Sequence, residues 1–553
     1  MKKIFMMAAI TLLLSGCGGG GSGGSPAAVP QQQVGSAATI SGKVTFDQVP
    51  VAITRGISKL DYNNSIRRPA RSISVALIDS STGAELATAK TDAAGDYALP
   101  KPAAGQSVFV RAYAKLLPVN ANTTEIVSIM DNTNGNAQWA IDSAAFSTAG
   151  DDVLTKNLHA SSGWTGTAYN SSLRVAGTFA ILDTIYTGMQ KIVAVDNSAS
   201  FKKLSVYWSP DNVATAGQLA VGQIGSSFFQ ETTTGGMVSA RAIYLLGKAN
   251  NDTDEYDSHV VAHEFGHYLQ SVFSRDDSVG GSHGGTNDRL DMRVAFSEGW
   301  GNGWSGYALG DRFYADTSGF NQADGFSFDI SAGETSNPGW FKESSVQKVI
   351  WDLSTGSIGF GQVWTAMKTG FATSPALTSA HSFANALRVN LPTSRATLDT
   401  IFNGQNIFVP SDAYGAGEAN FGTPTIAEIQ PIYITYGALG STSNVCVTNA
   451  ADSGGAGNKA GEHRYLKLSL PAGGRTFTVA RDVATTTARI ATDPDFRVYS
   501  AAGAFLIAES AQPNFESTLP ANLATGDYVL VLTDFMFQTS LTARTTCFDV
   551  TVN

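Results

Sequence analysis

The sequence predicts a multidomain protein, in which an α+β middle domain is flanked by N-terminal and C-terminal all-β sandwich domains. Three observations support this fold class. At 553 residues the chain is too long for one hydrophobic core. Both ends carry short segments of alternating apolar and polar residues, separated by Gly, Pro and Asp. The middle instead carries apolar residues at helical spacing.

The overall composition excludes some classes of protein. A hydrophobic content of 43% with 15% charged residues is that of a globular protein. The net charge of −10 argues against a nucleic-acid partner, because nucleic-acid binding requires a basic surface.

The N-terminus predicts export and lipid anchoring. Residues 1–17 combine two lysines, the short apolar run IFMMAAITLLL and the sequence Leu-Ser-Gly-Cys, which resembles the bacterial lipobox. This resemblance implies cleavage before Cys17 and lipidation of its thiol, and hence a place in the bacterial cell envelope on a membrane. An ordinary signal peptide with an incidental cysteine is the alternative. Residues 18–37 have the composition of a flexible tether.

Residues 38–115 predict the N-terminal β-sandwich. The segments ISVALI and VFVRAYA alternate in the manner of half-buried strands, and TDAAGDYAL reads as a turn before another strand. Together with GKVTF, these segments resemble the small prealbumin-like domains that accompany many secreted peptidases. No chemistry is visible in this domain.

Residues 116–437 form the predicted α+β domain, within which residues 116–170 are poorly defined. From Gly177 onward, GTFAILDTIYTGMQKIVAV places its apolar residues on one helical stripe. Strand candidates LSVYWS, SSFFQ and ARAIYLLG follow, and helical stretches include SSVQKVIWDL and SFANALRV. The strand at residues 240–247 is a candidate edge strand for pairing with an extended substrate.

Residues 438–553 return to alternation and predict the C-terminal β-sandwich, similar to modules that follow the catalytic domain of many bacterial secreted peptidases. Cys446 and Cys547 lie near its two ends. In an exported protein such an isolated pair most simply forms a disulfide bond.

The segment VVAHEFGHYLQ carries the principal chemical motif. His263 and His267 lie four residues apart on a predicted helix, so both imidazoles can point at one ion. Glu264 lies beside them, where the general base of a zinc hydrolase belongs. A surface helix with two solvated histidines is the alternative, but the apolar residues 260–262 indicate a buried helix whose polar side chains need partners. We therefore expect a Zn²⁺ site.

Zinc in a catalytic site needs a third protein ligand, and Glu298 is the best candidate. It is the only carboxylate in the apolar, glycine-rich segment RVAFSEGWGNGWSGYAL, which reads as a second helix with Asp291 as a candidate N-cap. A buried carboxylate needs a positive partner. An exposed carboxylate and an internal salt bridge remain the alternatives.

HEFGH, followed by the glycine-rich VGGSHGG and then SEGWGN, resembles the gluzincin class of zinc metallopeptidases, and most closely its fungalysin and thermolysin-like branches. The resemblance covers roughly residues 250–310. It implies a zincin-like fold, with His263, His267 and Glu298 as metal ligands and Glu264 as general base. The family has an aspartate four residues after the ligand glutamate, where this chain has Asn302. An asparagine carbonyl can still accept the imidazole N–H, but it adds no negative charge.

Other candidate residues have weaker signals. Tyr307, Tyr314, His283 and His381 could each steady an oxyanion, although each is individually more consistent with a structural role. We interpret the three histidines without a surrounding motif, His159, His259 and His463, as structural. The acidic run of residues 250–257 could bind Ca²⁺, but it lacks the ligand spacing of a known loop and favours a solvated loop instead.

The sequence therefore predicts an exported, lipid-anchored zinc metalloendopeptidase that acts on a peptide or protein. The competing hypothesis is a surface adhesion or binding protein with a catalytically weak core. A third hypothesis is an enzyme kept latent by its N-terminal domain.

Overall fold

The computed structural model describes residues 39–553 except for short gaps at residues 103–104, 125–126, 150–153, 235–236, 286, 411, 423–425, 452–456, 484–490, 501–504, 508–513, 519–520 and 539–541. The predicted signal peptide, Cys17 and the tether lie outside the described residues. None of the helices within these described ranges has the length and apolarity needed to cross a membrane.

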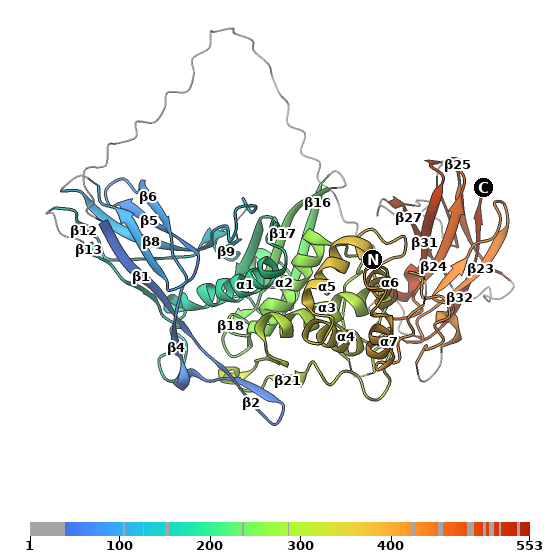
Figure 1. Ribbon diagram of the computed structural model, residues 1–553, viewed down its shortest axis with the longest axis horizontal. Coiled ribbons are helices and arrows are strands. Elements are labelled where there is room, and N and C mark those ends of the chain that lie inside the picture. Colours follow the sequence, from blue (N-terminus) through green and yellow to red (C-terminus); the bar gives the residue numbers. More distant parts are fainter. Residues whose placement is uncertain are drawn as a thin grey trace, which may run out of the picture.

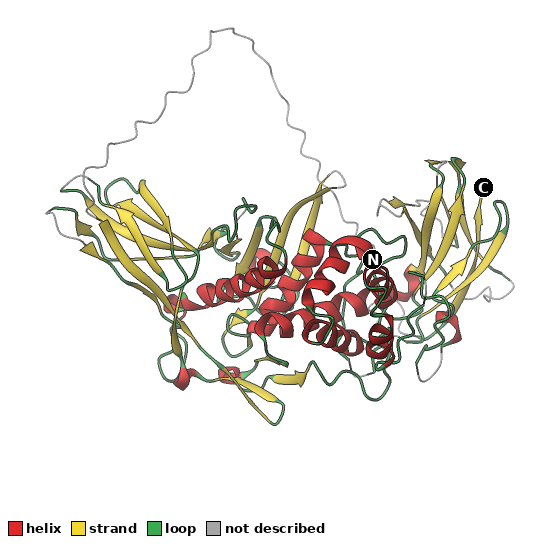
Figure 2. Cartoon of the chain, viewed as in Figure 1, coloured by secondary structure: helices red, strands yellow, loops and turns green. Residues whose placement is uncertain are grey.

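The structure confirms the coarse fold class: a multidomain chain with many β-sheets and a smaller number of helices (Figures 1 and 2). The largest sheet joins ten of the described strands, and its main path runs β16-β17-β15-β9-β8-β5-β6. The strands on this path are β5 (Ile73–Asp79), β6 (Glu85–Lys90), β8 (Ser107–Leu116), β9 (Val127–Asp131), β15 (Leu204–Trp208), β16 (Phe228–Thr234) and β17 (Met237–Leu245). The short strands β10 (Ala137–Gln138), β11 (Ala140–Asp142) and β12 (Phe146–Ser147) pair beside it.

A second sheet is built around the long strand β1 (Thr39–Gln48). This strand pairs in parallel with β13 (Leu154–Thr155) and β14 (Leu158–Ala160), and antiparallel with β4 (Ile66–Pro69) and β7 (Asp96–Pro100). The hairpin of β2 (Val51–Thr54) and β3 (Ile57–Leu60) extends from this sheet toward β20 (Phe313–Asp316) and β21 (Phe326–Asp329) (Figure 1).

The largest sheet crosses the boundary expected between residues 115 and 116. Strand β8 ends at Leu116 and pairs with β9, which in turn pairs in parallel with β15. One continuous hydrophobic core also extends from Ile40 in β1 to Phe296 in the helical region. Residues 116–170 lacked a readable pattern because their strands are only two to five residues long and pair with distant partners.

Strand β17, which contains most of the predicted edge strand, is not at the edge. It lies between β15, its parallel neighbour, and β16, its antiparallel neighbour. The prediction of an edge strand at residues 240–247 is therefore wrong, because the preceding segment folds back and covers it. In the described part of the sheet, the edge next to β17 is formed by β16.

The helices gather between the two β-rich ends of the molecule (Figure 2). They are α1 (Ala176–Val195), α2 (Ser258–Phe273), α3 (Met292–Leu309), α4 (Glu343–Thr355), α5 (Phe360–Ala366), α6 (Ala380–Asn390) and α7 (Arg395–Asn403). Helix α1 contacts β1 and β8 on one side and α2 on the other, so it links the sheets to the helices. Helix α3 lies between α2 and α4.

The C-terminal region contains two larger sheets that share a separate hydrophobic core, and a two-stranded sheet of β25 (Gly473–Arg475) and β30 (Ala521–Leu523). One has the order β22-β24-β31-β27-β28, and the other β23-β32-β26-β29. Their strands are β22 (Tyr433–Thr435), β23 (Thr442–Thr448), β24 (His463–Leu470), β26 (Phe477–Arg481), β27 (Pro494–Ser500), β28 (Phe505–Ile507), β29 (Phe515–Ser517), β31 (Gly526–Asp534) and β32 (Thr545–Val552). The predicted Cys446–Cys547 disulfide is confirmed, and it joins paired residues of β23 and β32.

Candidate metal centre

Helices α2 and α3 approach closely because glycines lie where they meet. A Cβ atom on Gly301 would lie 2.8 Å from two atoms of the His263 ring, and one on Gly266 would lie 2.9 Å from the Trp304 ring. Trp300 Nε1 also donates a hydrogen bond of 2.9 Å to the Gly266 carbonyl. The absence of side chains at these two positions brings the ligand-bearing faces of the helices together.

The opposite face of α3 uses glycine in the same way. A Cβ on Gly303 would lie 2.7 Å from Ile350 of α4, and one on Gly299, one turn earlier, would lie even closer to Val346. Asp291 caps the helix, because its side chain accepts a hydrogen bond of 3.0 Å from the Arg293 amide. The glycine-rich sequence of α3 thus reflects packing on two sides.

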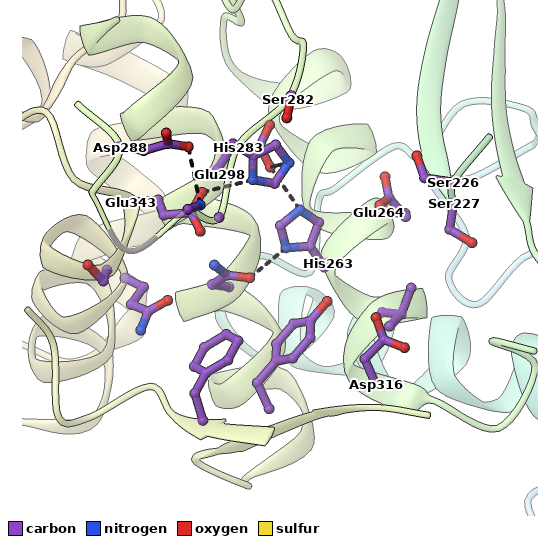
Figure 3. A pocket seen from close by; sticks show the side chains of 18 of the residues that line it. Ser226, Ser227, His263, Glu264, Ser282, His283, Asp288, Glu298, Asp316 and Glu343 are labelled. Atoms are coloured by element: carbon purple, nitrogen blue, oxygen red, sulfur yellow. Dashed lines mark hydrogen bonds and ion pairs between the residues drawn. The ribbon is translucent and has the colours of Figure 1, made fainter. Parts of the chain in front are cut away.

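His263 and His267 of α2 converge with Glu298 of α3. The two Nε2 atoms are 3.0 Å apart, and Glu298 Oε2 lies 3.1 Å from His263 Nε2 and 3.5 Å from His267 Nε2. All three side chains are buried, and one potential ligand atom from each lies within 4.8 Å of the others. The structure thus brings together the three residues predicted as metal ligands, two of which, His263 and Glu298, are labelled in Figure 3.

The outer hydrogen bonds of the two histidines indicate their tautomers. The Asn302 carbonyl oxygen can only accept, so the Nδ1 atom of His263, 2.8 Å away, carries the proton. The Ser297 hydroxyl lies 3.2 Å from Asp276 Oδ2 and 3.1 Å from His267 Nδ1. Burial raises the pKa of Asp276 to about 6. An ionised Asp276 accepts the Ser297 proton, which leaves Ser297 Oγ to accept the His267 Nδ1 proton.

These tautomers leave both Nε2 lone pairs facing the Glu298 carboxylate. Three acceptors so close together repel one another unless a cation or an added proton lies between them. Burial opposes protonation of His267, but the Glu298 charge outweighs it and raises the His267 pKa to about 9. Two imidazole nitrogens and one carboxylate oxygen are the ligand set of a catalytic zinc ion, so these residues fit Zn²⁺.

His283 approaches the same carboxylate from the glycine-rich loop before α3. Its Nε2 lies 3.3 Å from Glu298 Oε2, and its Nδ1 lies 2.8 Å from Glu343 Oε2 at the start of α4. Burial opposes the charged imidazole, but Glu298 and Glu343 outweigh it and raise its pKa to about 10. The sequence did not single out Asp276, Ser297 or Glu343, because nothing in their local pattern shows that they meet the histidines.

A cavity of about 1120 Å³ opens beside the three predicted metal ligands. Glu264 and His283 line it (Figure 3), and Tyr314 lines it as well. The Tyr314 ring stacks on Phe328 at a centroid distance of 4.8 Å and lies 6.3 Å from the His263 ring. Two of the four candidate oxyanion donors therefore face the space where a substrate would lie.

The other two candidates lie elsewhere. Tyr307 stacks on Phe360 at 4.2 Å, and His381 is buried with its Nε2 atom 3.0 Å from Glu418. Neither residue lines the cavity.

The three histidines interpreted as structural also have partners away from the metal ligands. His159 pairs with Asp47 at 3.1 Å, His463 with Asp291 at 3.2 Å, and His259 Nε2 lies 3.2 Å from the Asp311 carbonyl oxygen.

The acidic run contributes to a partly buried cluster rather than a solvated loop. Asp252 and Asp254 meet Asp316 of β20, with one oxygen from each within 4.8 Å of the others, and all three line the cavity. Asp257 begins α2 as its N-cap, but its side chain makes no capping bond and accepts from Thr317 instead. Calcium binding at this cluster stays a prediction.

This cluster predicts a particular pH dependence. Burial raises the pKa of Asp252 to about 6 and that of Asp316 to about 7, while burial and the charges of Asp252 and Asp316 raise the pKa of Asp254 well above its usual range. In the unfolded chain such groups ionise near about pH 4. The folded state therefore holds more protons between these values, and its stability falls as pH rises from about 4 to about 7.

We expect Asp254→Asn to raise the melting temperature by several degrees at pH 8, because it removes one of the crowded charges, and to have little effect at pH 4. Differential scanning calorimetry of both proteins in chelator measures this. A stabilising effect of the same size at both pH values would contradict it. If the cluster binds Ca²⁺, millimolar Ca²⁺ at pH 8 should make the melting temperature of the wild-type protein the higher of the two, because the variant lacks a charged ligand.

Comparisons with known proteins identify no family. No protein-family model and no curated protein matches the chain. Among solved structures, the pre-peptidase C-terminal domain of a Bacillus anthracis collagenase is 10% identical and covers 22% of this chain and 94% of its own, with a TM-score of 0.16. Aeromonas hydrophila PliG, a periplasmic inhibitor of g-type lysozyme, is 15% identical and covers 22% and 96%, with a TM-score of 0.15. A Paenibacillus cycloisomaltooligosaccharide glucanotransferase is 8% identical and covers 93% and 72%, with a TM-score of 0.12. Likenesses this weak carry no argument about function.

Proposed function

We propose that the protein is an exported, lipid-anchored zinc metallopeptidase of the gluzincin class, which cleaves peptide bonds with a zinc-activated water. The observation that carries the proposal is the convergence of the Nε2 atoms of His263 and His267 with the Glu298 carboxylate, beside a cavity that Glu264 also lines. The bacterial cell envelope as location and the prealbumin-like nature of the N-terminal strands are parts of the same proposal, and they rest on the sequence motifs.

Zinc held by His263, His267 and Glu298 would polarise the scissile carbonyl and lower the pKa of a bound water. Glu264 faces the cavity as a carboxylate that can take a proton from the attacking water and return it to the departing amine. Tyr314 and His283 are the cavity residues that can donate a hydrogen bond to the developing oxyanion. Asn302, Ser297 and Asp276 hold the imidazoles in the required tautomers.

The substrate is proposed to be an extended peptide that pairs with β16. This strand lies at the described edge of the largest sheet, and its Phe228 and Phe229 line the cavity. A peptide added to this edge would form main-chain hydrogen bonds, and the two phenylalanines would bury its apolar side chains.

Metal content and turnover measured on one preparation test the proposal. We expect about one zinc per chain, and cleavage of casein or quenched peptides that a chelator stops and zinc restores. The competing hypothesis, a binding protein with a weak catalytic core, draws on Asn302, which adds no charge to its ligand histidine. Stoichiometric zinc without turnover on diverse peptides would favour that hypothesis, and a protein without zinc would contradict the proposed metallopeptidase.

A further inference from the structure

The loop that carries His283 has little means of holding its own shape. Residues 280–285 read GGSHGG, and Gly280, Gly281 and Gly284 have φ angles of 62°, 97° and 88°. Glycine at positive φ has more backbone freedom to lose than other residues. Yet this loop lines the cavity and presents the His283 ring to Glu298. Its local hydrogen bonds, from the Gly280 amide to Ser278 Oγ at 3.1 Å and from the Gly285 amide to Asp288 Oδ2 at 3.2 Å, lie at its two ends, so the middle of the loop relies on neighbouring segments.

Two residues of the C-terminal module, residues 438–553, supply these contacts. Asn458 Nδ2 donates to the Gly280 carbonyl at 2.8 Å and to the Ser282 carbonyl at 3.1 Å. Lys459 Nζ donates to the Ser282 carbonyl at 2.6 Å and lies 3.2 Å from Asp288. Two carbonyls of the loop, that of Gly280 and that of Ser282 directly before His283, are thus held from outside.

Both donors are buried. Asn458 is 1% exposed and Lys459 is 4% exposed. Burying a lysine is costly unless its ammonium group is paired and hydrogen-bonded, and here the partners are Asp288 and a backbone carbonyl of the loop. A contact whose only role is to attach two domains does not require a buried ammonium group.

The same segment also anchors the start of α3, the helix that carries Glu298. The Asp291 amide donates to the Asn458 carbonyl at 2.9 Å, and the Ala460 amide donates to the Arg289 carbonyl at 2.8 Å. Tyr465 donates to the Asp291 carboxylate at 2.5 Å. One short stretch of the C-terminal module therefore contacts both elements that meet at Glu298.

We propose that Asn458 and Lys459 are positioning residues of the active site, which act through the glycine-rich loop to hold His283 against Glu298. The C-terminal module is then a working part of the catalytic centre. The expected effect on kcat rests on the proposed function, whereas the expected effect on the conformation of the glycine-rich loop does not.

The test is Lys459→Met and Asn458→Ala, each also combined with His283→Ala. We expect amide hydrogen exchange of residues 279–285 to rise about tenfold or more in Lys459→Met and Asn458→Ala, with exchange in β24 unchanged. Zinc affinity from chelator competition and kcat should each fall about tenfold. In the His283→Ala background, Lys459→Met should lower neither the zinc affinity nor kcat any further. The reason is that Lys459 acts by positioning the His283 ring, which this background lacks. Arg475→Met is the matched control, since Arg475 donates only to carbonyls of its own turn in the same module.

Unchanged hydrogen exchange in the loop would overturn the inference. It would also be overturned if the losses of zinc affinity and kcat in the two single variants added in full in the double variant, because that is the result of a general destabilisation that does not depend on His283. If Lys459→Met does not fold, Asn458→Ala, which keeps the ammonium group, gives the same comparison. If the wild-type protein shows no turnover, the proposed function fails. The exchange and zinc measurements then still decide the inference.

Discussion

Glu264→Gln is expected to abolish peptide hydrolysis while leaving the zinc content unchanged. The amide keeps the size of the side chain in the cavity wall but cannot take a proton from water. Positioned general bases contribute about 10²–10⁴-fold to rate, and we expect a loss of at least about 10³-fold. Glu264 is not one of the three converging ligands, so about one zinc per chain should remain. Steady-state kinetics and metal analysis of the same preparation measure both quantities.

Glu334→Gln is the matched control, because Glu334 lines the same cavity but is not among the three converging ligands. Its kcat/KM should stay within about twofold, since the amide oxygen can still accept from the Ser336 amide. Full activity in Glu264→Gln would refute the mechanism. Loss of zinc from that variant would instead show that Glu264 helps to hold the metal.

Gly301→Ala is expected to weaken zinc binding strongly, although residue 301 touches no metal. The added methyl group would lie 2.8 Å from the His263 ring, whose Nδ1 atom is held by a hydrogen bond to Asn302. The ring or the helix must move. We expect a 10–100-fold loss of zinc affinity, about the cost of disturbing a residue that orients a ligand. Overpacking should also lower the free energy of unfolding by about 1–3 kcal/mol.

The measurements are chelator competition and chemical unfolding of the metal-free protein. Gly361→Ala in α5 is the control, because its nearest neighbour outside the helix, Val195, is 3.9 Å from the added carbon. That change should stabilise the protein by about 0.5–1 kcal/mol, since alanine favours a helix. Wild-type zinc affinity in Gly301→Ala would show that α2 and α3 separate without cost, contrary to the packing described above.

The sequence predicted the local features of the candidate site well. His263 and His267 share a helical face because their spacing determines it, and Glu298 could be inferred because an isolated carboxylate in an apolar helix needs a partner. Helix α3 begins at Met292, directly after the expected cap residue Asp291. Periodicity was sufficient for α1 as well.

Features that depend on distant contacts could not be predicted. Asp276 and Glu343 reach the histidines only through loop and helix packing, and neither lies in a recognisable motif. The pairing of β8 with β9 and of β9 with β15 removed the expected boundary at residue 115, because hydrogen bonds between strands leave no periodic signal in either strand. Helix α3 was readable as a helix, but its glycines gave no indication of two close neighbours.

The shared sheet also changes how the latency hypothesis can be tested. Removing residues 26–115 would take away β1, β5, β6 and β8 and expose the core beneath α1. Such a deletion is expected to unfold the protein, so lost activity would not show that the N-terminal strands regulate the enzyme. Point changes in the β2–β3 hairpin are the better approach, because Ser58 donates to the carbonyls of Asp316 and Phe326 at the cavity wall.

The pairing of β1 has a consequence for how the protein is made. Ile40 pairs with Leu154 and Val44 with Leu158. Strand β9 pairs with β15, which begins only at Leu204. An emerging chain cannot complete its first sheet until more than a hundred further residues have been synthesised. Such high contact order makes folding slow. A nascent chain that folds this slowly stays extended for longer, which suits the export proposed above, because a translocation channel accepts only extended polypeptide.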